Sequence, residues 1–206
     1  MQARVTLPEK QYKGYIFDLD GTLVDSMPTH YRAWRSALKH YGVPSEAFRW
    51  DEFVSHGGMS APDIVRELNG RYGMDMDAEE VGSYKRDCYT RLIHDGQLPC
   101  IRETADLVRS LVARGIPCAI GTGSLMPGPL ETLSAAGMQD LFSIIVTPAD
   151  VPNGKPAPDI FLRCAELMGV APADCVVFED AEPGMRAARA AGMDLVVVGP
   201  CPRVDD

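Results

Sequence analysis

Two aspartates separated by a single residue follow a short apolar run near the start of the chain. Residues 15–26 read Tyr-Ile-Phe-Asp-Leu-Asp-Gly-Thr-Leu-Val-Asp-Ser, so Asp18 and Asp20 come directly after strand-forming residues. Because side chains alternate along a strand, both carboxylates start on the same side of the backbone, and they repel unless a divalent cation binds or one keeps its proton. Gly21 lets the chain turn sharply after the pair. For this segment alone, a solvated surface turn is the competing interpretation.

Further polar groups follow two predicted strands later in the chain. Thr122 and Gly123 come after one of them, and Glu179 and Asp180 come after the other. In an open parallel sheet, ligands bind at the carboxyl ends of the strands, so these groups and the first two aspartates are expected to meet at one edge. The alternatives are a plain tight turn at Thr122 and, for the acidic pair, a cap on the helix that follows. A dinucleotide-binding loop is excluded at Thr122, since its third glycine would fall on a methionine.

A lysine stands in an unusually stiff loop ahead of a predicted helix. Lys155 lies in Asn-Gly-Lys-Pro-Ala-Pro-Asp, residues 153–159, where two prolines restrict the backbone. A lysine held rigidly there can neutralise Asp18. A merely solvated lysine is the alternative.

The elements that must position these groups show two different patterns. Residues 27–97 are helical throughout, which predicts an inserted helical cap. One of its helices is expected to start within Ser-Ala-Pro-Asp, residues 60–63, and to end at Asn69–Gly70. From residue 98 onward, helices alternate with strands, as in βαβ units whose parallel sheet is covered on both faces. The predicted fold is α/β, a doubly wound parallel five-stranded sheet with a catalytic core of residues 1–26 and 98–206, in which residues 1–12 form a loosely held leader. The strands are expected at residues 15–17, 117–120, 143–146, 175–178 and 195–198.

Composition excludes several classes of protein. The 206 residues are 46% hydrophobic and 24% charged, and their net charge of −9 argues against a general nucleic-acid binder. No apolar run approaches the ~20 residues of a membrane helix, and the N-terminal segment does not read as a signal peptide. The six cysteines are scattered, which predicts reduced core residues rather than disulfides or a zinc site. We expect a cytoplasmic monomer that binds no nucleic acid and no membrane.

These motifs together resemble those of the haloacid-dehalogenase-type phosphohydrolases. Asp18-Leu-Asp-Gly-Thr-Leu is similar to the first motif, and the other three polar clusters match the remaining motifs over nearly the whole chain. The resemblance implies that the first strand is central, with strand order 5-4-1-2-3. It also implies that Asp18 attacks phosphorus to form an aspartyl-phosphate and that Asp20 acts as general acid and base. For that role Asp20 must be protonated part of the time, which we expect its neighbouring carboxylates to favour. The implied phosphate-binding groups are Thr122, Gly123 and Lys155, and Mg²⁺ would be held by Asp18, Asp180 and the backbone carbonyl of Asp20, with Glu179 binding or steering a water.

Within that family, one branch is most similar. The strings Pro-Thr-His-x-x-Ala-Trp, Gly-Thr-Gly-Ser and Cys-Val-Val-Phe-Glu-Asp-Ala resemble the bacterial fructose-1-phosphatase and 6-phosphogluconate phosphatase group, related to β-phosphoglucomutase. This implies Mg²⁺-dependent hydrolysis of a small sugar monophosphate similar to fructose 1-phosphate. In that branch, the residues matching His30 and Lys85 contact the phosphate or the sugar. Solvated helix residues are the alternative at both positions.

Two other functions stay open. A β-phosphoglucomutase-type phosphomutase uses the same core, but its cap carries an arginine in a Gly-x-Ser-Arg segment, which binds a second phosphate. The matching segment here is Gly-Met-Ser-Ala at residues 58–61, and Arg66 could substitute only if the cap were tilted differently. A non-enzymatic phosphoacceptor also pairs an aspartate with Mg²⁺, threonine and lysine. Receiver domains of that kind are shorter and lack a helical insertion, so hydrolysis is favoured.

Overall fold

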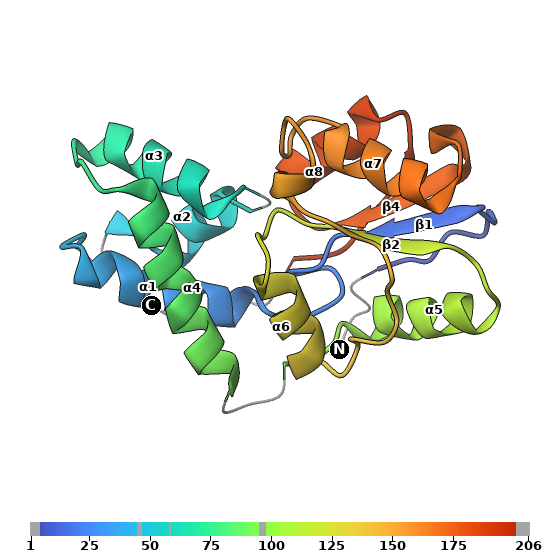
Figure 1. Ribbon diagram of the computed structural model, residues 1–206, viewed down its shortest axis with the longest axis horizontal. Helices are drawn as coiled ribbons and strands as arrows, with labels where there is room; N and C mark the ends of the chain where they lie inside the picture. Colours follow the sequence, from blue (N-terminus) through green and yellow to red (C-terminus); the bar gives the residue numbers. More distant parts are fainter. Residues whose placement is uncertain (1–4, 45–46, 58, 95–97, 201–206) are drawn as a thin grey trace.

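A computed structural model describes residues 5–44, 47–57, 59–94 and 98–200 of the chain. It has a part built around a parallel sheet and, beside it, a part built only of helices (Figure 1). No helix among the described residues is long and apolar enough to cross a membrane. The five cysteines in the described ranges are free thiols, as expected.

The sheet has five parallel strands, and the first is central. Their order is β3-β2-β1-β4-β5, which confirms the doubly wound fold and the strand order that the family resemblance implied. Phe17, at the end of β1, is in register with Ile120 of β2 and with Phe178 of β4. The carboxyl ends of the three middle strands therefore lie level with one another. The strands are β1 (Gly14–Phe17), β2 (Cys118–Gly121), β3 (Ile145–Val146), β4 (Cys175–Glu179) and β5 (Asp194–Val197).

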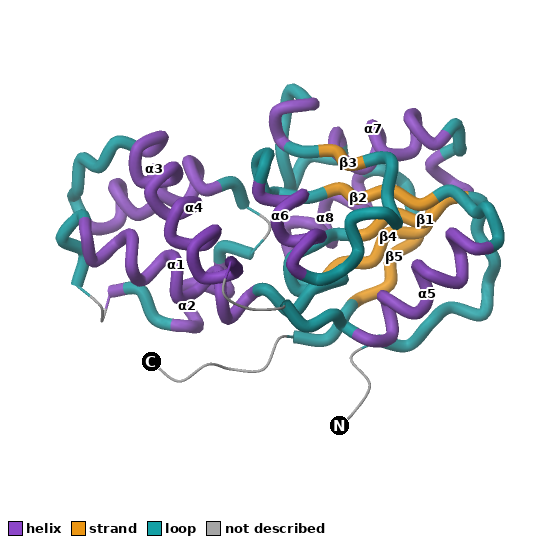
Figure 2. The backbone as a smooth tube through the Cα atoms, turned by 60° about the horizontal axis from the view of Figure 1, so that its bottom comes forward, coloured by secondary structure: helices purple, strands orange, loops and turns teal. Residues whose placement is uncertain are grey.

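Both faces of the sheet are covered by helices, because successive residues of the central strand point to opposite sides. Ile16 belongs to one apolar cluster, and its neighbours Tyr15 and Phe17 belong to the other. Figures 1 and 2 show α7 and α8 on the first of these faces and α5 and α6 on the second. The helices are α5 (Arg102–Ala113), α6 (Gly128–Ala135), α7 (Asp159–Met168) and α8 (Glu182–Ala190).

The helical part, here called the helical insertion, leaves the sheet after β1 and returns before α5. It consists of α1 (Met27–His40), α2 (Trp50–Ser55), α3 (Ala61–Tyr72) and α4 (Ala78–His94). Its core includes Tyr31, Trp34 and Phe53, while Cys88, Tyr89 and Ile93 of α4 join the apolar cluster of the sheet part instead. The domain boundaries at residues 26/27 and 97/98 stay a prediction, and residues 95–97 lie outside the described residues.

Two expectations about the chain were wrong. Helix α3 does not stop at Asn69–Gly70 but continues to Tyr72, ending at Gly73 with a left-handed φ of 64°. The Asn69 side chain bonds the backbone of Met76 rather than ending the helix. Nor is the leader loose throughout: Val5 is buried in the apolar cluster of α5 and α6, and Tyr12 donates to Asp194 at 2.9 Å.

Candidate active site

A buried lysine bridges two acidic residues at the carboxyl ends of the central strands. Lys155 Nζ lies 2.7 Å from Asp18 Oδ1 and 2.7 Å from Glu179 Oε1, and all three side chains are buried. The acids meet because β1 and β4 are neighbours, and the Asp18 amide continues the ladder by donating to the Phe178 carbonyl at 3.0 Å. Burial tends to lower the pKa of Lys155, but the charges of Asp18 and Glu179 raise it, so the lysine is a permanent cation.

Asp180 completes a group of three carboxylates. Oxygens of Asp18, Glu179 and Asp180 lie within 4.8 Å of one another. Burial and the charge of Glu179 raise the pKa of Asp180 to about 7. Burial, together with the charges of Glu179 and Asp180, also raises the pKa of Asp18 well above its usual range, despite Lys155. Carboxylates crowded in this way, all hard oxygen donors, fit a divalent cation such as Mg²⁺.

The carboxylate of Glu179 is held differently from those of Asp18 and Asp180. Glu179 accepts from Lys155 through Oε1 and from the Ala181 amide through Oε2, at 2.6 Å. Asp180 accepts from the Thr22 hydroxyl at 3.0 Å. Both oxygens of Glu179 are thus occupied by protein donors, which fits the interpretation that Glu179 orients its neighbours or a water.

Two glycines leave room for this group of acids. Gly21 has a left-handed φ of 94°, and a Cβ there would overlap the carboxyl group of Asp180. At Gly184, in the first turn of α8, a Cβ would overlap the carboxyl group of Glu179. The close backbone approach explains why small residues stand at both places.

We expect Gly184→Ala to destabilise the protein by about 1–3 kcal/mol and to remove most of its activity. The added methyl group displaces Glu179, and with it the anchor of Lys155. The control is Gly70→Ala in α3, where a Cβ meets nothing within 4 Å, so helix propensity should stabilise that variant by up to about 1 kcal/mol. Urea unfolding of both variants measures the difference. A Gly184→Ala protein that gains stability like the control would contradict the packing argument.

Asp20 lies in a separate network of hydrogen bonds. Its Oδ1 accepts from Ser26 Oγ at 2.6 Å and lies 2.9 Å from His30 Nε2, while its Oδ2 accepts from Ser124 Oγ at 2.9 Å. Burial alone would raise the pKa of Asp20, but the electrostatic interaction with His30 and the hydrogen bonds from His30, Ser26 and Ser124 lower it. The expectation that neighbouring carboxylates favour its protonation was therefore wrong, because its side chain lies outside the group formed by Asp18, Glu179 and Asp180.

His30 and Lys85 connect this network to the helical insertion. Lys85 Nζ lies 2.7 Å from His30 Nδ1, so the ammonium donates to that nitrogen and Nε2–H donates to Asp20. Burial lowers the pKa of Lys85 to about 8, and burial and the charge of Lys85 lower that of His30. The His30 ring stacks on Tyr89, with ring centroids 4.0 Å apart. Contact of His30 and Lys85 with a substrate stays a prediction.

The loop after β2 forms the remaining side of the site. Thr122 is buried, its amide donates to the Val146 carbonyl at 3.0 Å, and its hydroxyl accepts from the Ser124 amide at 3.0 Å. Gly123 lies between them and lines the same cavity. The structure thus brings the sequence-predicted residues of all four clusters to one edge of the sheet, although Asp20 and the three-carboxylate group occupy different positions along it.

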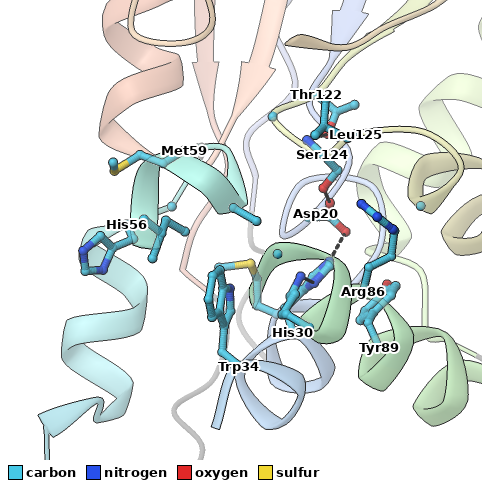
Figure 3. Close-up of a pocket in the computed structure, with 18 of the residues that line it drawn as sticks. Asp20, His30, Trp34, His56, Met59, Arg86, Tyr89, Thr122, Ser124 and Leu125 are labelled. Carbon is cyan, nitrogen blue, oxygen red and sulfur yellow. Dashed lines mark hydrogen bonds and ion pairs between the residues drawn. The ribbon is translucent and has the colours of Figure 1, made fainter. Parts of the chain in front are cut away.

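A cavity of about 130 Å³ lies between this edge and the helical insertion (Figure 3). Across it, Tyr89 Oη lies 2.8 Å from Thr132 Oγ1 of α6, which connects the insertion to the sheet part. A cavity of this size suits a small molecule rather than a polymer. Its lining from the insertion includes His30, Trp34, Met59, Lys85, Arg86 and Tyr89.

Several of these groups escaped the sequence analysis. Ser26 and Ser124 hold Asp20, and Arg86 and Tyr89 line the cavity. The serines carry a weak signal, since one precedes a helix and the other lies in Gly-Thr-Gly-Ser, but nothing in the sequence marks Arg86. The candidate substitute Arg66 is exposed on α3, bonds Asp63 at 2.6 Å and does not line the cavity.

The fold and the site together define a class of enzyme. A doubly wound sheet with a helical insertion, a buried aspartate–lysine pair and a metal-binding group of acids under a small cavity is the arrangement of a phosphoric monoester hydrolase. The model of one protein family, described as haloacid dehalogenase-like hydrolase, matches residues 12–192. The chain belongs to this family.

Known proteins similar to this chain cover nearly all of it. Fructose-1-phosphate phosphatase YqaB of Escherichia coli (strain K12) is 38% identical over 92% of this chain and 97% of its own length. Hexitol phosphatase A of the same organism is 35% identical over 90% of this chain and 82% of its own. The crystal structure of a hydrolase from Pseudomonas syringae superposes with a TM-score of 0.77 at 29% identity, covering 88% of this chain and 82% of that one.

Proposed function

We propose that this enzyme is a Mg²⁺-dependent phosphatase that hydrolyses a small sugar monophosphate, similar to fructose 1-phosphate, through an aspartyl-phosphate on Asp18. The observation that carries the proposal is the position of Asp18, which is buried beside Lys155 and the other acids and lines a cavity between the sheet edge and the helical insertion. The two relatives are named for activity on fructose 1-phosphate and on hexitol phosphates, which supports a sugar phosphate as the substrate.

In the first step, an Asp18 oxygen forms a bond to phosphorus while the bond from phosphorus to the sugar oxygen breaks. Lys155 keeps its positive charge and offsets the negative charge of the phosphoryl group, assisted by the hydroxyl of Thr122 and the amide of Gly123. The leaving sugar oxygen takes a proton from Asp20. Lys85 and His30 provide this proton in sequence, because Lys85 donates to His30 Nδ1 and His30 Nε2–H donates to Asp20 Oδ1.

In the second step, Asp20 takes a proton from a water that attacks the phosphorus of the aspartyl-phosphate, which breaks the bond from phosphorus to Asp18 and releases phosphate. The proton then returns from Asp20 through His30 to Lys85, which restores the starting state. Three hydrogen bonds to its carboxylate hold Asp20 ionised and oriented for this role. Mg²⁺ held by Asp18 and Asp180, with Glu179 beside them, would stabilise the charge on the phosphoryl oxygens.

The test is phosphate release from a panel of sugar monophosphates, with fructose 1-phosphate and glucitol 6-phosphate included. Activity should vanish in EDTA and return with excess Mg²⁺. Full activity in chelator would contradict the metal assignment, and no turnover of any sugar phosphate would contradict the substrate class.

One observation favours the alternative function, a phosphomutase. The arginine of the Gly-x-Ser-Arg segment of those mutases is missing here, but the guanidinium group of Arg86 lines the cavity. Supplying β-glucose 1-phosphate with a trace of glucose 1,6-bisphosphate separates the two functions. We expect free phosphate to form faster than glucose 6-phosphate. The opposite order would establish the mutase.

We also predict that the metal-free protein loses stability as pH rises from about 4 to about 7. Asp180, with a folded-state pKa of about 7, and Asp18, also raised, bind more protons in the folded state than in the unfolded state across this window. The free energy of unfolding should fall by at most about 1.4 kcal/mol per pH unit for each proton. Urea unfolding in EDTA measures this slope, and Mg²⁺ or Asp180→Asn should flatten it. Stability that rises across the window in EDTA would contradict the assignment.

A further inference from the structure

One buried histidine of the helical insertion has no role in the mechanism above. His56 directly follows α2, its side chain is 2% exposed, and the residue lines the cavity together with Gly57 and Met59. In Figure 3 its ring points away from Asp20, so the ring does not reach the groups that react. Any effect of His56 on the site therefore passes through the part of the chain that carries it.

The two ring nitrogens of His56 have different surroundings. Nδ1 lies 2.8 Å from the backbone carbonyl of Glu52, and because a carbonyl only accepts, Nδ1 carries a proton. Nε2 is buried and has no hydrogen-bond partner among the described residues. It lies 3.4 Å from Glu67 Oε1 and 4.0 Å from Glu52 Oε1. In a neutral ring, the lone pair of Nε2 would face two carboxylates, whereas a proton on Nε2 turns this repulsion into attraction.

The charges around the ring also favour that second proton. Glu52 of α2 and Glu67 of α3 face the ring, and the cation that pairs with both of them is Arg71 of α3. Two negative charges and one positive charge leave this group at −1, which an imidazolium brings to zero. The remaining neighbour is uncharged, since the ring of Phe48 lies with its centroid 6.1 Å from that of His56.

His56 anchors a part of the cavity wall that also touches the sheet part. The Met59 amide donates to the His56 carbonyl at 3.1 Å, and both residues line the cavity. Gly57 lies against the loop after β4, because a Cβ on it would come within 3.0 Å of the Cβ of Ala181. An ion pair from the His56 ring to Glu67 connects this wall to α3. The charge of one side chain can thus determine how firmly the wall is held.

We propose that His56 is a positioning residue that acts as an imidazolium, whose ion pair with Glu67 holds the wall formed by Gly57 and Met59 in the shape that binds the substrate. This inference rests on the proposed function. Histidine changes its charge between about pH 5 and pH 8, so the ion pair is present at the lower end of this range and is lost as pH rises. Substrate binding weakens in the same direction, while kcat is unaffected, because the ring does not contact the reacting atoms.

The test is the KM for fructose 1-phosphate at pH 6 and pH 8, compared between the wild-type enzyme and His56→Asn. Asparagine keeps a donor for the Glu52 carbonyl but lacks the second nitrogen that faces Glu67. At pH 6 we expect the variant to have a KM at least about threefold higher, with the same kcat. At pH 8 the two values of KM should be close. The ratio isolates His56, because the other groups of the site titrate in both proteins.

A second variant removes the same ion pair from an exposed position. Glu67→Gln leaves the packing of His56 in place and should also raise KM at pH 6, and His56→Asn should then have a smaller effect than in the wild-type background. The control variant is His94→Gln, which replaces an exposed histidine at the end of α4 and should leave KM unchanged at both pH values. Equal ratios of KM at pH 6 and pH 8, or a loss of kcat in place of the rise in KM, overturn the inference.

The charge of the ring can be measured without turnover. NMR of the protein with ¹⁵N-labelled histidine reports the protonation of each ring nitrogen, and the signals that vanish in His56→Asn belong to His56. At pH 6 we expect both nitrogens to carry protons, and Glu67→Gln should make Nε2 lose its proton at a lower pH than in the wild-type protein. If the enzyme releases no phosphate from any ester, the proposed function fails, yet this result would still support the ion pair. A neutral His56 ring at pH 6 overturns the inference even if hydrolysis is found.

Discussion

Asp18→Asn is expected to lower kcat at least about a thousandfold, because an amide cannot form the bond to phosphorus that the carboxylate forms. The fold should survive. Burial and two neighbouring acids raise the pKa of Asp18 well above its usual range, so a neutral group of the same shape relieves repulsion there. We therefore expect the variant to unfold at the same temperature as the wild-type protein or at a higher one.

Phosphate release and thermal unfolding, measured on the same preparation, test both halves of this prediction. The control is Asp140→Asn, an exposed aspartate after α6 that should change neither quantity. A variant with more than a few per cent of wild-type kcat would remove Asp18 from the role of nucleophile. A variant that is inactive because it unfolds would show that the charge of Asp18 is needed for the fold.

Lys155→Met is expected to have the largest effect on stability, a loss of about 3–5 kcal/mol, along with loss of activity. The substitution leaves Asp18 and Glu179 buried without their shared cation. The loss should be smaller at low pH, because the two acids can then take up protons instead. Urea unfolding at pH 5 and pH 8 measures both the loss and its direction.

A surface pair provides the matched control for Lys155. Lys13 lies 3.0 Å from Asp174, and both side chains are largely solvent-accessible. Lys13→Met should therefore cost no more than about 1 kcal/mol. Equal losses in the two variants would mean that the charge of Lys155 does not hold the site together.

Much of the site was predictable because it depends on local rules. Apolar runs interrupted by glycine and polar residues predicted the strands, and the parallel topology required their carboxyl ends to share an edge. Asp18, Thr122 and Asp180 could be placed there without knowing any side-chain position, since each directly follows a strand. Lys155 was marked by the prolines around it.

The rest depends on contacts between distant segments. The ionisation of Asp20 depends on His30 of the insertion and also on Ser124, 104 residues further along the chain. Likewise, the end of α3 could not be read from Asn69–Gly70, because the Asn69 amide finds its partners at Met76. Arg86 has no local signature, since an arginine on a helix is solvated unless tertiary structure closes a cavity over it.

Helix α4 has two roles, packing against the sheet part and lining the cavity, and different residues serve each role. Cys88 and Ile93 pack into the apolar cluster of the sheet part, while Gly82 and Arg86 face the cavity. A substitution of Gly82 or Arg86 can alter which substrate binds without weakening the packing of the insertion against the sheet part. Single substitutions on this helix can therefore change the substrate specificity of the enzyme while the catalytic residues at the edge of the sheet stay the same.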